Sequence, residues 1–363
     1  MTAVARARWI QSPLGDLALA FCWVPFSILA HVTLDDRLAI GMVLMATFAL
    51  SFAHQPLTLP IVYSDPLERA ARRRLYTWCP VVFLVAATGG LALSVVLVAV
   101  VAGLWNAEHT LMQRYGITRI YARKAGEPGV AGTGEKAMLV SWLVLAALWA
   151  AADAGTVGQV RRLPLGEVNA EGLRLLTDLR PWAQRLLPLA VAAVVVLGAR
   201  WASAEVARFR AGAGNPAKLV YLAATAVLIA VMIVDPVVGF VGYVGAHAVE
   251  YFVIVNRSLA SRWVDAGTGG PLGELVRRPG GRRRFLAGYA AVMVAMVGGL
   301  RWYGNQRLYL TVVLVLGGLH ILYDGFIWKL RRPSVAAGLV GPVPVAVPAP
   351  AGVGQPMSSN ASA

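Results

Sequence analysis

The sequence predicts an all-α integral membrane protein, a polytopic bundle of about ten transmembrane helices. Apolar residues make up 58% of the 363 residues and charged residues only 14%. Several apolar runs reach the ~20 residues that a helix needs to cross a bilayer. Lysine and arginine lie mainly in the short connectors between these runs, where such residues determine topology. The net charge of +15 therefore does not indicate nucleic-acid binding.

A single transmembrane domain is expected over residues 1–332. Within it, the apolar stretch 75–118 is too long for one span and short for two, and Gly89-Gly90 is its expected break. The two cysteines lie in or beside apolar runs and predict neither a disulfide framework nor a thiolate metal site. The expected spans are residues 15–33, 38–61, 75–89, 91–118, 137–155, 186–203, 217–234, 237–257, 285–300 and 307–329.

The distribution of basic residues favours two passes in the stretch 75–118. With two passes, all the basic connectors share one side of the membrane, which the positive-inside rule makes the cytoplasm. One pass would scatter them over both sides. Ten helices with both termini in the cytoplasm, in the cell membrane, is the consistent arrangement. The basic segments are residues 69–74, 117–124, 207–218, 277–284 and 329–333.

Two segments outside the spans have their own patterns. In the connector 157–185, the stretch EVNAEGLRLLTDL has leucines at helical spacing, which predicts a short helix lying on the outer membrane surface. Residues 333–363 are an uncharged stretch rich in proline, alanine and glycine, which predicts a disordered tail.

Four of the five histidines fall at one expected depth. His54, His109, His247 and His320 each lie on a separate helix that runs from outside to inside, between the bilayer centre and the inner leaflet. One histidine per helix at a shared depth is what a convergent metal site requires. The fifth, His31, ends the first span and is expected at the outer interface.

Acidic residues accompany three of these histidines and are the candidate catalytic groups. Glu108 adjoins His109, Glu250 follows His247 by three residues, and Asp324 follows His320 by four. Acids are costly in the membrane unless they are paired. A carboxylate often accepts the second N–H of a metal-bound imidazole, so Asp324 is predicted to orient His320 or to bind the metal itself.

The helices that carry the histidines have features of close packing. Gly239, Gly242 and Gly245 form a ridge that leads to His247, and Gly317-Gly318 precede His320, which lets neighbouring backbones approach. Pro56 and Pro60 should break the helix just after His54. The structural alternative is that intramembrane histidines and acids only bond across helices and stabilise the bundle, with Glu108 and Arg114 as a buried ion pair.

The donor set favours non-haem iron. Nitrogen ligands with nearby oxygens suit iron, copper or zinc, and the lack of thiolates disfavours copper(I) and iron–sulfur clusters. A site inside the hydrocarbon is suited to oxygen chemistry on a lipid-soluble molecule, such as an isoprenoid, carotenoid or acyl lipid. The sequence therefore predicts a membrane-bound metal-dependent oxidoreductase whose partners are the bilayer and a lipid-soluble small molecule.

This pattern of histidines resembles a known family. Four histidines on separate membrane helices, with a carboxylate one turn after the last in LHILYD (319–324), are similar to the Brp/Blh family of bacterial β-carotene 15,15′-dioxygenases. The resemblance covers a few short segments and implies that the four histidines are iron ligands. The chain departs from that family in having more expected spans and no close pair of histidines on one helix.

Three other classes remain open from the sequence. A membrane cytochrome would use histidines as axial haem ligands, although usually two on one helix. A proton-coupled transporter would use the histidines and acids as a relay, and would be expected to show an internal repeat that is not evident here. A scaffold without bound metal is the third.

Overall fold

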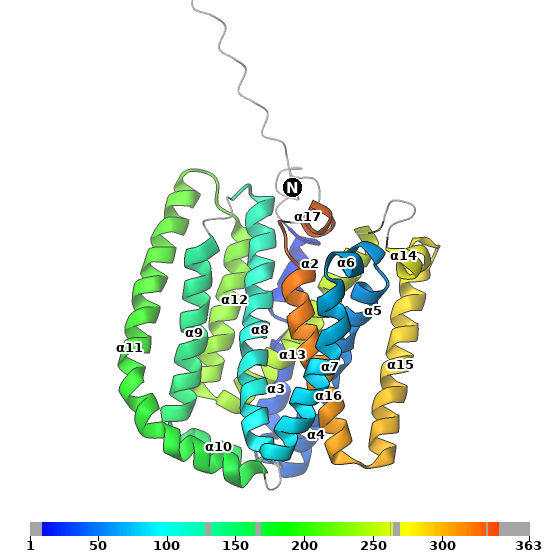
Figure 1. Ribbon diagram of the computed structural model, residues 1–363. Helices are drawn as coiled ribbons and strands as arrows, with labels where there is room; N and C mark the ends of the chain where they lie inside the picture. The colour runs from blue at the N-terminus through cyan, green and yellow to red at the C-terminus, as the bar shows by residue number, and fades with distance from the viewer. Residues whose placement is uncertain are drawn as a thin grey trace, which may run out of the picture.

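The computed structural model describes residues 9–127, 132–163, 168–261, 263, 269–331 and 333–340, and this part of the chain is built of helices packed side by side (Figure 1). Ten helices or helix pairs in it are long and apolar enough to cross a membrane, which confirms the all-α class and the expected number of spans. The spanning units are α2 with α3 (Pro13–Ala20, Val24–Thr33), α4 with α5 (Arg37–His54, Thr58–Tyr63), α7 (Arg73–Leu93), α8 (Val95–Lys124), α9 (Gly132–Ala152), α11 (Val168–Arg210), α12 (Pro216–Val234), α13 (Pro236–Ser261), α15 (Gly281–Tyr303) and α16 (Gln306–Ile327).

The stretch 75–118 crosses the bundle twice, as the charge pattern predicts, but the predicted break at Gly89-Gly90 is wrong. The helices α7 and α8 are separated at Ser94, whose backbone is extended and whose hydroxyl accepts the Leu97 N–H at 3.1 Å. This hydroxyl caps the start of α8. Gly90 lies inside α7, where a Cβ would come within 2.7 Å of Val98. Its role is therefore to let the two helices approach after the turn.

The basic segments gather at one end of the bundle, which we call the basic end. In Figure 1 this is the end that carries α17 (Pro333–Val340), the short helices α6 (Pro66–Ala71) and α14 (Gly270–Arg277), the last turn of α8, and the connection from α11 to α12. Every basic segment of the sequence lies beside one of these features. The two-pass arrangement of residues 75–118 is what puts them together.

The connector before α11 differs from its prediction. The stretch EVNAEGLRLLTDL does not form a separate surface helix, because its described residues begin the 43-residue α11. In Figure 1 this first part of α11 crosses the end of the bundle opposite the basic end, below α10 (Ala154–Arg162), and the helix then bends to run beside α9. Pro181 and Pro188 lie within the helix and account for bending.

The start of the tail also differs from its prediction, because Pro333–Val340 form the helix α17. Val335, Leu339 and Val340 are buried in one apolar cluster with Tyr121 of α8 and Ile254 of α13. The sequence VAAGLV therefore has enough apolar surface to pack, although its composition is that of a disordered segment. The rest of the predicted tail, residues 341–363, lies outside the described residues.

Helix α13 occupies the centre of the bundle, because 78% of its apolar 18-residue segment is buried. The predicted glycine ridge makes this possible: a Cβ on Gly245 would lie 2.5 Å from the Phe26 ring of α3, and one on Gly239 would clash with the Met232 backbone of α12. Small residues let membrane helices approach at backbone distance. The ridge thus holds His247, two residues beyond Gly245, in the middle of the bundle.

The two-pass arrangement makes a testable topological prediction. In a variant without Cys22 and Cys79, a cysteine at the exposed Arg73 before the α7 span and one at the exposed Thr133 after α8 should react with a membrane-impermeant maleimide from the same side. A cysteine at Trp302, which is 94% exposed at the other end, is the control and should react only from the opposite side. Labelling of Arg73→Cys and Thr133→Cys from opposite sides would rule out the arrangement.

Candidate metal centre

The four histidines predicted to converge do so in the structure. Their rings contact one another pairwise: the ring centroids of His54 and His247 are 4.6 Å apart, those of His54 and His320 4.8 Å, those of His109 and His320 4.8 Å, and those of His109 and His247 5.1 Å. Helices α4, α8, α13 and α16 each contribute one ring. Three of the histidines have no exposed surface, and His109 is 7% exposed. The exposed His31 lies far from them along the chain, at the end of α3.

Breaks and glycines in the carrying helices allow this convergence. Helix α4 ends at His54, a 3₁₀ turn follows over Gln55–Leu57, and α5 begins at Thr58, as the prolines predict. On α16, a Cβ at Gly317 would come within 3.0 Å of Gln55, and one at Gly318 would clash with the Phe83 ring. The two glycines therefore let α16 approach both the broken helix and α7.

A hydrogen-bond chain fixes the orientation of the His320 ring. The Thr58 hydroxyl donates to Asp324 Oδ1 at 3.0 Å and lies 2.8 Å from His320 Nδ1. Thr58 has a single hydroxyl proton; when it donates that proton's hydrogen bond to Asp324, it can only accept from His320, which then carries its proton on Nδ1. The lone pair of His320 is then on Nε2, which faces His109 Nε2 at 3.1 Å. Second-shell hydrogen bonds fix the tautomer of metal-binding histidines in this way.

Asp324 acts on His320 mainly through Thr58 and not by the direct contact that the sequence suggested. Its Oδ2 atom is 3.7 Å from His320 Nδ1 and 3.9 Å from His109 Nε2. Its Oδ1 atom also accepts the Tyr251 hydroxyl at 3.1 Å. The carboxylate is thus held by two hydroxyl donors while its second oxygen lies near two imidazoles.

The possible ligand atoms fall into two overlapping groups. His54, His247 and His320 form one, and His109, His320 and Asp324 form the other, and within each the ligand atoms lie within 4.8 Å of one another. His320 belongs to both. The arrangement offers imidazole nitrogens from four helices and one carboxylate oxygen, in two groups of three that share His320.

His54 and His247 provide the most informative feature of the site. None of their four ring nitrogens has a hydrogen-bond partner within the part of the chain that the structure describes, and both side chains are fully buried. A buried polar group without a partner costs roughly 1–3 kcal/mol. Two such rings in contact inside a membrane bundle therefore present four nitrogens that no described residue satisfies.

Thr58 and Tyr251 were missed by the sequence reasoning, although a signal for them exists. Every one of the four histidines is followed four residues later by a polar residue: Thr58 after His54, Gln113 after His109, Tyr251 after His247 and Asp324 after His320. Residues four apart lie on one helix face. Thr58, Tyr251 and Asp324 bond one another, and the Thr58 and Tyr251 hydroxyl oxygens are 2.6 Å apart.

Glu250, one of the candidate catalytic acids, bonds residues other than His247. Its Oε1 atom lies 2.8 Å from Arg114 Nη2 and accepts the Tyr221 hydroxyl at 2.8 Å, and its Oε2 atom accepts the Gln113 amide at 3.2 Å. Arg114 and Glu250 have no exposed side-chain surface. A buried guanidinium requires a counter-ion, and Glu250 is the counter-ion of Arg114. Glu108 is therefore not the partner of Arg114.

Glu108 lies instead on the wall of a cavity of about 760 Å³ that reaches the histidine cluster. The cavity lies between α8 and α16 and is lined by His109, Asp324 and Tyr251 as well as by Glu108. His109 is the only one of the four clustered histidines on its wall. The cluster is therefore open on the side of His109 and Asp324 and closed on the side of His54 and His247.

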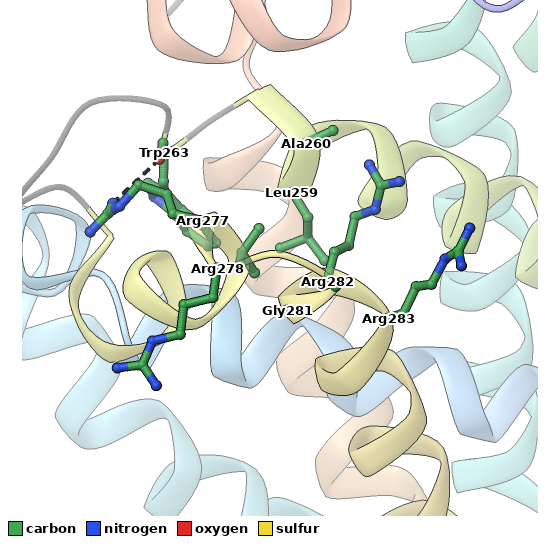
Figure 2. Close-up of a pocket in the computed structure, with 10 residues that line it drawn as sticks. Leu259, Ala260, Trp263, Arg277, Arg278, Gly281, Arg282 and Arg283 are labelled. Atoms are coloured by element: carbon green, nitrogen blue, oxygen red, sulfur yellow. Dashed lines mark hydrogen bonds between the residues drawn. The ribbon is translucent and has the colours of Figure 1, made fainter.

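Two other polar sites in the described residues have simpler explanations. Glu127, Glu135 and Glu205 lie close together, but Lys218, Arg119 and Arg208 form ion pairs with them, so three basic side chains balance the three carboxylates. A second cavity, of about 660 Å³, is lined by arginines at the start of α15. Figure 2 shows Arg278 pointing away from Arg282 and Arg283, while Arg277 is bonded to the Trp263 carbonyl, so the guanidinium groups do not converge on one point.

Comparison with protein-family models, with curated proteins and with solved structures gives no match for this chain. The geometry of the site is therefore the basis for the functional argument.

The hydrogen-bond chain predicts the effect of Thr58→Val. This substitution keeps the shape of the side chain but removes the acceptor of His320 Nδ1–H and one of the hydroxyl donors to Asp324 Oδ1, so unfolding in detergent should be easier by about 1–3 kcal/mol. Thr88→Val on α7 is the control, because the Thr88 hydroxyl is exposed and bonds only its own helix, to Leu84 and Val85. Equal stability of the two variants would contradict the role given to Thr58.

The buried ion pair predicts a different pattern. Glu250→Gln leaves the Arg114 charge unpaired inside the bundle and should destabilise the protein by about 3–5 kcal/mol. Adding Arg114→Met removes that charge, so the double variant should recover a large part of the loss in the same unfolding measurement. A double variant that is less stable than Glu250→Gln alone would show that the pair is not the source of the effect.

Proposed function

We propose that this protein is a membrane-bound, metal-dependent oxidoreductase in which His54, His109, His247 and His320 hold a non-haem metal ion, with iron as the best candidate. The observation that carries the proposal is the pair of fully buried rings, His54 and His247, whose nitrogens have no partner among the described residues. A metal ion among the four imidazoles would give those nitrogens the partner that they lack.

The residues of the site fit a bare metal ion. Four imidazoles and one carboxylate suit iron, copper or zinc, whereas sites for soft copper(I) use thiolates or thioethers. The rings are 4.6 to 6.2 Å apart between centroids, a spacing that leaves no room for a porphyrin between any two of them. This favours an ion over haem. A bound iron ion would supply redox chemistry with dioxygen. A site inside the hydrocarbon gains nothing by hydrolysing water-soluble substrates, so this chemistry suits the site better than hydrolysis does.

The protein's own residues have definite roles in this proposal. Thr58 and Asp324 keep the lone pair of His320 on Nε2, toward His109. Asp324 and Glu108 are the acidic groups on the cavity wall and are the candidate proton carriers for a substrate bound there. Glu250 would position α8 and α13 through its ion pair with Arg114 in this proposal.

The substrate is proposed to enter from the membrane, because the cavity that reaches His109 lies between two membrane-spanning helices. We also propose that the metal centre is similar to that of the Brp/Blh dioxygenases, because a carboxylate follows the last histidine and the cavity opens between membrane-spanning helices. We also propose that the basic end faces the cytoplasm and that the protein resides in the cell membrane, on the positive-inside rule.

Metal analysis tests the proposal. His320→Ala should abolish stoichiometric iron in detergent-purified protein, whereas Asp324→Asn, which keeps the shape of the side chain, should weaken metal affinity by about 10- to 100-fold. His31→Ala on α3 is the matched control and should retain the wild-type iron content. A His320→Ala protein that folds and keeps its metal would overturn the assignment, as would wild-type protein that binds no transition metal.

A further inference from the structure

The cavity beside the histidine cluster has opposite charges at its two ends. Glu108 and Asp324 lie on its wall near His109, and Arg123, Lys136 and Lys329 lie on its wall at the basic end of the bundle. Arg119 is also on the wall, but its guanidinium is held by Glu127 at 2.7 Å. The cavity therefore has a cationic end, which we call its mouth, and an end with two acidic residues.

Apolar side chains form the passage between these ends. Ile117 and Ile120 of α8 and Ile321 and Leu322 of α16 line it, and Leu339 of α17 closes part of it near the mouth. Two glycines widen it: a Cβ on Gly116 or on Gly325 would meet no atom within 4 Å. These glycines are thus not required by helix packing, unlike Gly245 or Gly318, and they leave open space inside the cavity.

The length of the passage matches the depth of one membrane leaflet. Arg123 is 14 residues beyond His109 on the same helix, which corresponds to ~21 Å along the axis. Half of the hydrocarbon core is about 15 Å thick, and a lipid headgroup adds several ångströms beyond it. A lipid whose headgroup lies at Arg123 can therefore extend its chain to His109 without leaving its leaflet.

We propose that this cavity binds a long-chain lipid with a single anionic headgroup, a carboxylate or a phosphate, and that this lipid is the substrate of the metal centre. The claim that the lipid binds in the cavity stands by itself. The claim that the lipid is a substrate rests on the proposed function, because only a reactive metal centre makes the bound lipid a substrate. The headgroup lies among Arg123, Lys136 and Lys329, and the chain runs between α8 and α16 to His109.

The charges determine the orientation of the lipid and its class. An anionic headgroup is attracted to the cationic mouth and repelled by the acidic end, so the chain and not the headgroup reaches the histidines. Arg123 is suited to the headgroup because its one hydrogen bond within the described residues is to a neutral group, the Leu330 carbonyl at 2.6 Å. A neutral carotene has no group that these three cations would recognise, so the cavity favours an acyl or isoprenoid acid or phosphate.

Tryptophan quenching provides the test, because Trp105 and Trp328 both line the cavity. A long-chain fatty acid brominated on its chain should quench the fluorescence of the purified protein. Unbrominated fatty acid and a long-chain alkyl phosphate should compete with it, whereas the alcohol of equal length should compete at least 10-fold less well. Equal competition by the alcohol, or no quenching by the brominated acid, would overturn the proposal.

Two kinds of variant locate the lipid. Arg123→Gln with Lys329→Gln should weaken binding by roughly 10- to 30-fold, given the usual contribution of a basic side chain to binding an anionic lipid. Arg283→Gln with Arg284→Gln is the control, because it removes the same charge from exposed positions at the basic end outside this cavity. Because Arg123 also holds Leu330, Lys136→Gln on the exposed side of α9 provides a second, gentler test, for which a smaller loss is expected.

Filling the passage tests it without changing charge. Gly116→Leu should abolish quenching because the side chain would occupy the cavity. Gly103→Leu on the same helix is the control, since a Cβ there also meets no atom within 4 Å but the position is not on the cavity wall. Unchanged binding in Gly116→Leu would place the lipid elsewhere and refute the proposal.

Metal content measured in the same samples separates this inference from the proposed function. Iron bound without a preference for anionic lipid would refute the inference alone. Anion-selective binding that depends on Gly116 and Arg123 in a protein without metal would support the lipid site and refute its assignment as a substrate.

Discussion

The need to satisfy polar groups inside a membrane determines the centre of this protein. No water is available there to replace a missing hydrogen bond, so each buried polar group requires a partner from another helix. When the Thr58 hydroxyl donates to Asp324, His320 donates to Thr58, and the His320 lone pair is left facing His109. This single chain of bonds joins α5 to α16 and fixes the tautomer on which the proposed metal site depends.

The same requirement explains how two neighbouring polar clusters take different roles. Glu250 pairs with Arg114 and accepts from Tyr221 and Gln113, between α8, α12 and α13, so its carboxylate is engaged by three side chains of the bundle. His54 and His247 have no partners among the described residues, so they belong to a site that is incomplete within the chain.

Much of this arrangement can be predicted from the sequence. Apolar run lengths and the positions of lysine and arginine predict the ten spans, and Pro56 predicts the break after His54. The convergence of four histidines follows from their shared depth. The break between α7 and α8 could not be placed, because Gly90 is a contact glycine and the capping role of Ser94 depends on an extended backbone that composition does not reveal.

The partners of the acidic residues were less predictable for a physical reason. Glu250 is three residues from His247, and its sequence neighbours do not indicate that Arg114, 136 residues earlier, would claim it. The regular spacing of four residues from each histidine to a polar side chain is a better signal, and it includes Thr58 and Tyr251. The helix formed by Pro333–Val340 could not be predicted for a different reason. Its composition indicates disorder, whereas its contacts with α8 and α13 stabilise it.

X-ray absorption spectroscopy of the purified protein tests the central claim most directly, because it reports the atoms around a bound metal without requiring a known substrate. The account predicts an iron edge and a first shell dominated by nitrogen, with the outer-shell scattering typical of several imidazoles, and a reduced imidazole signal in His109→Ala. A spectrum with oxygen ligands alone, with sulfur ligands, or with no imidazole scattering would contradict it.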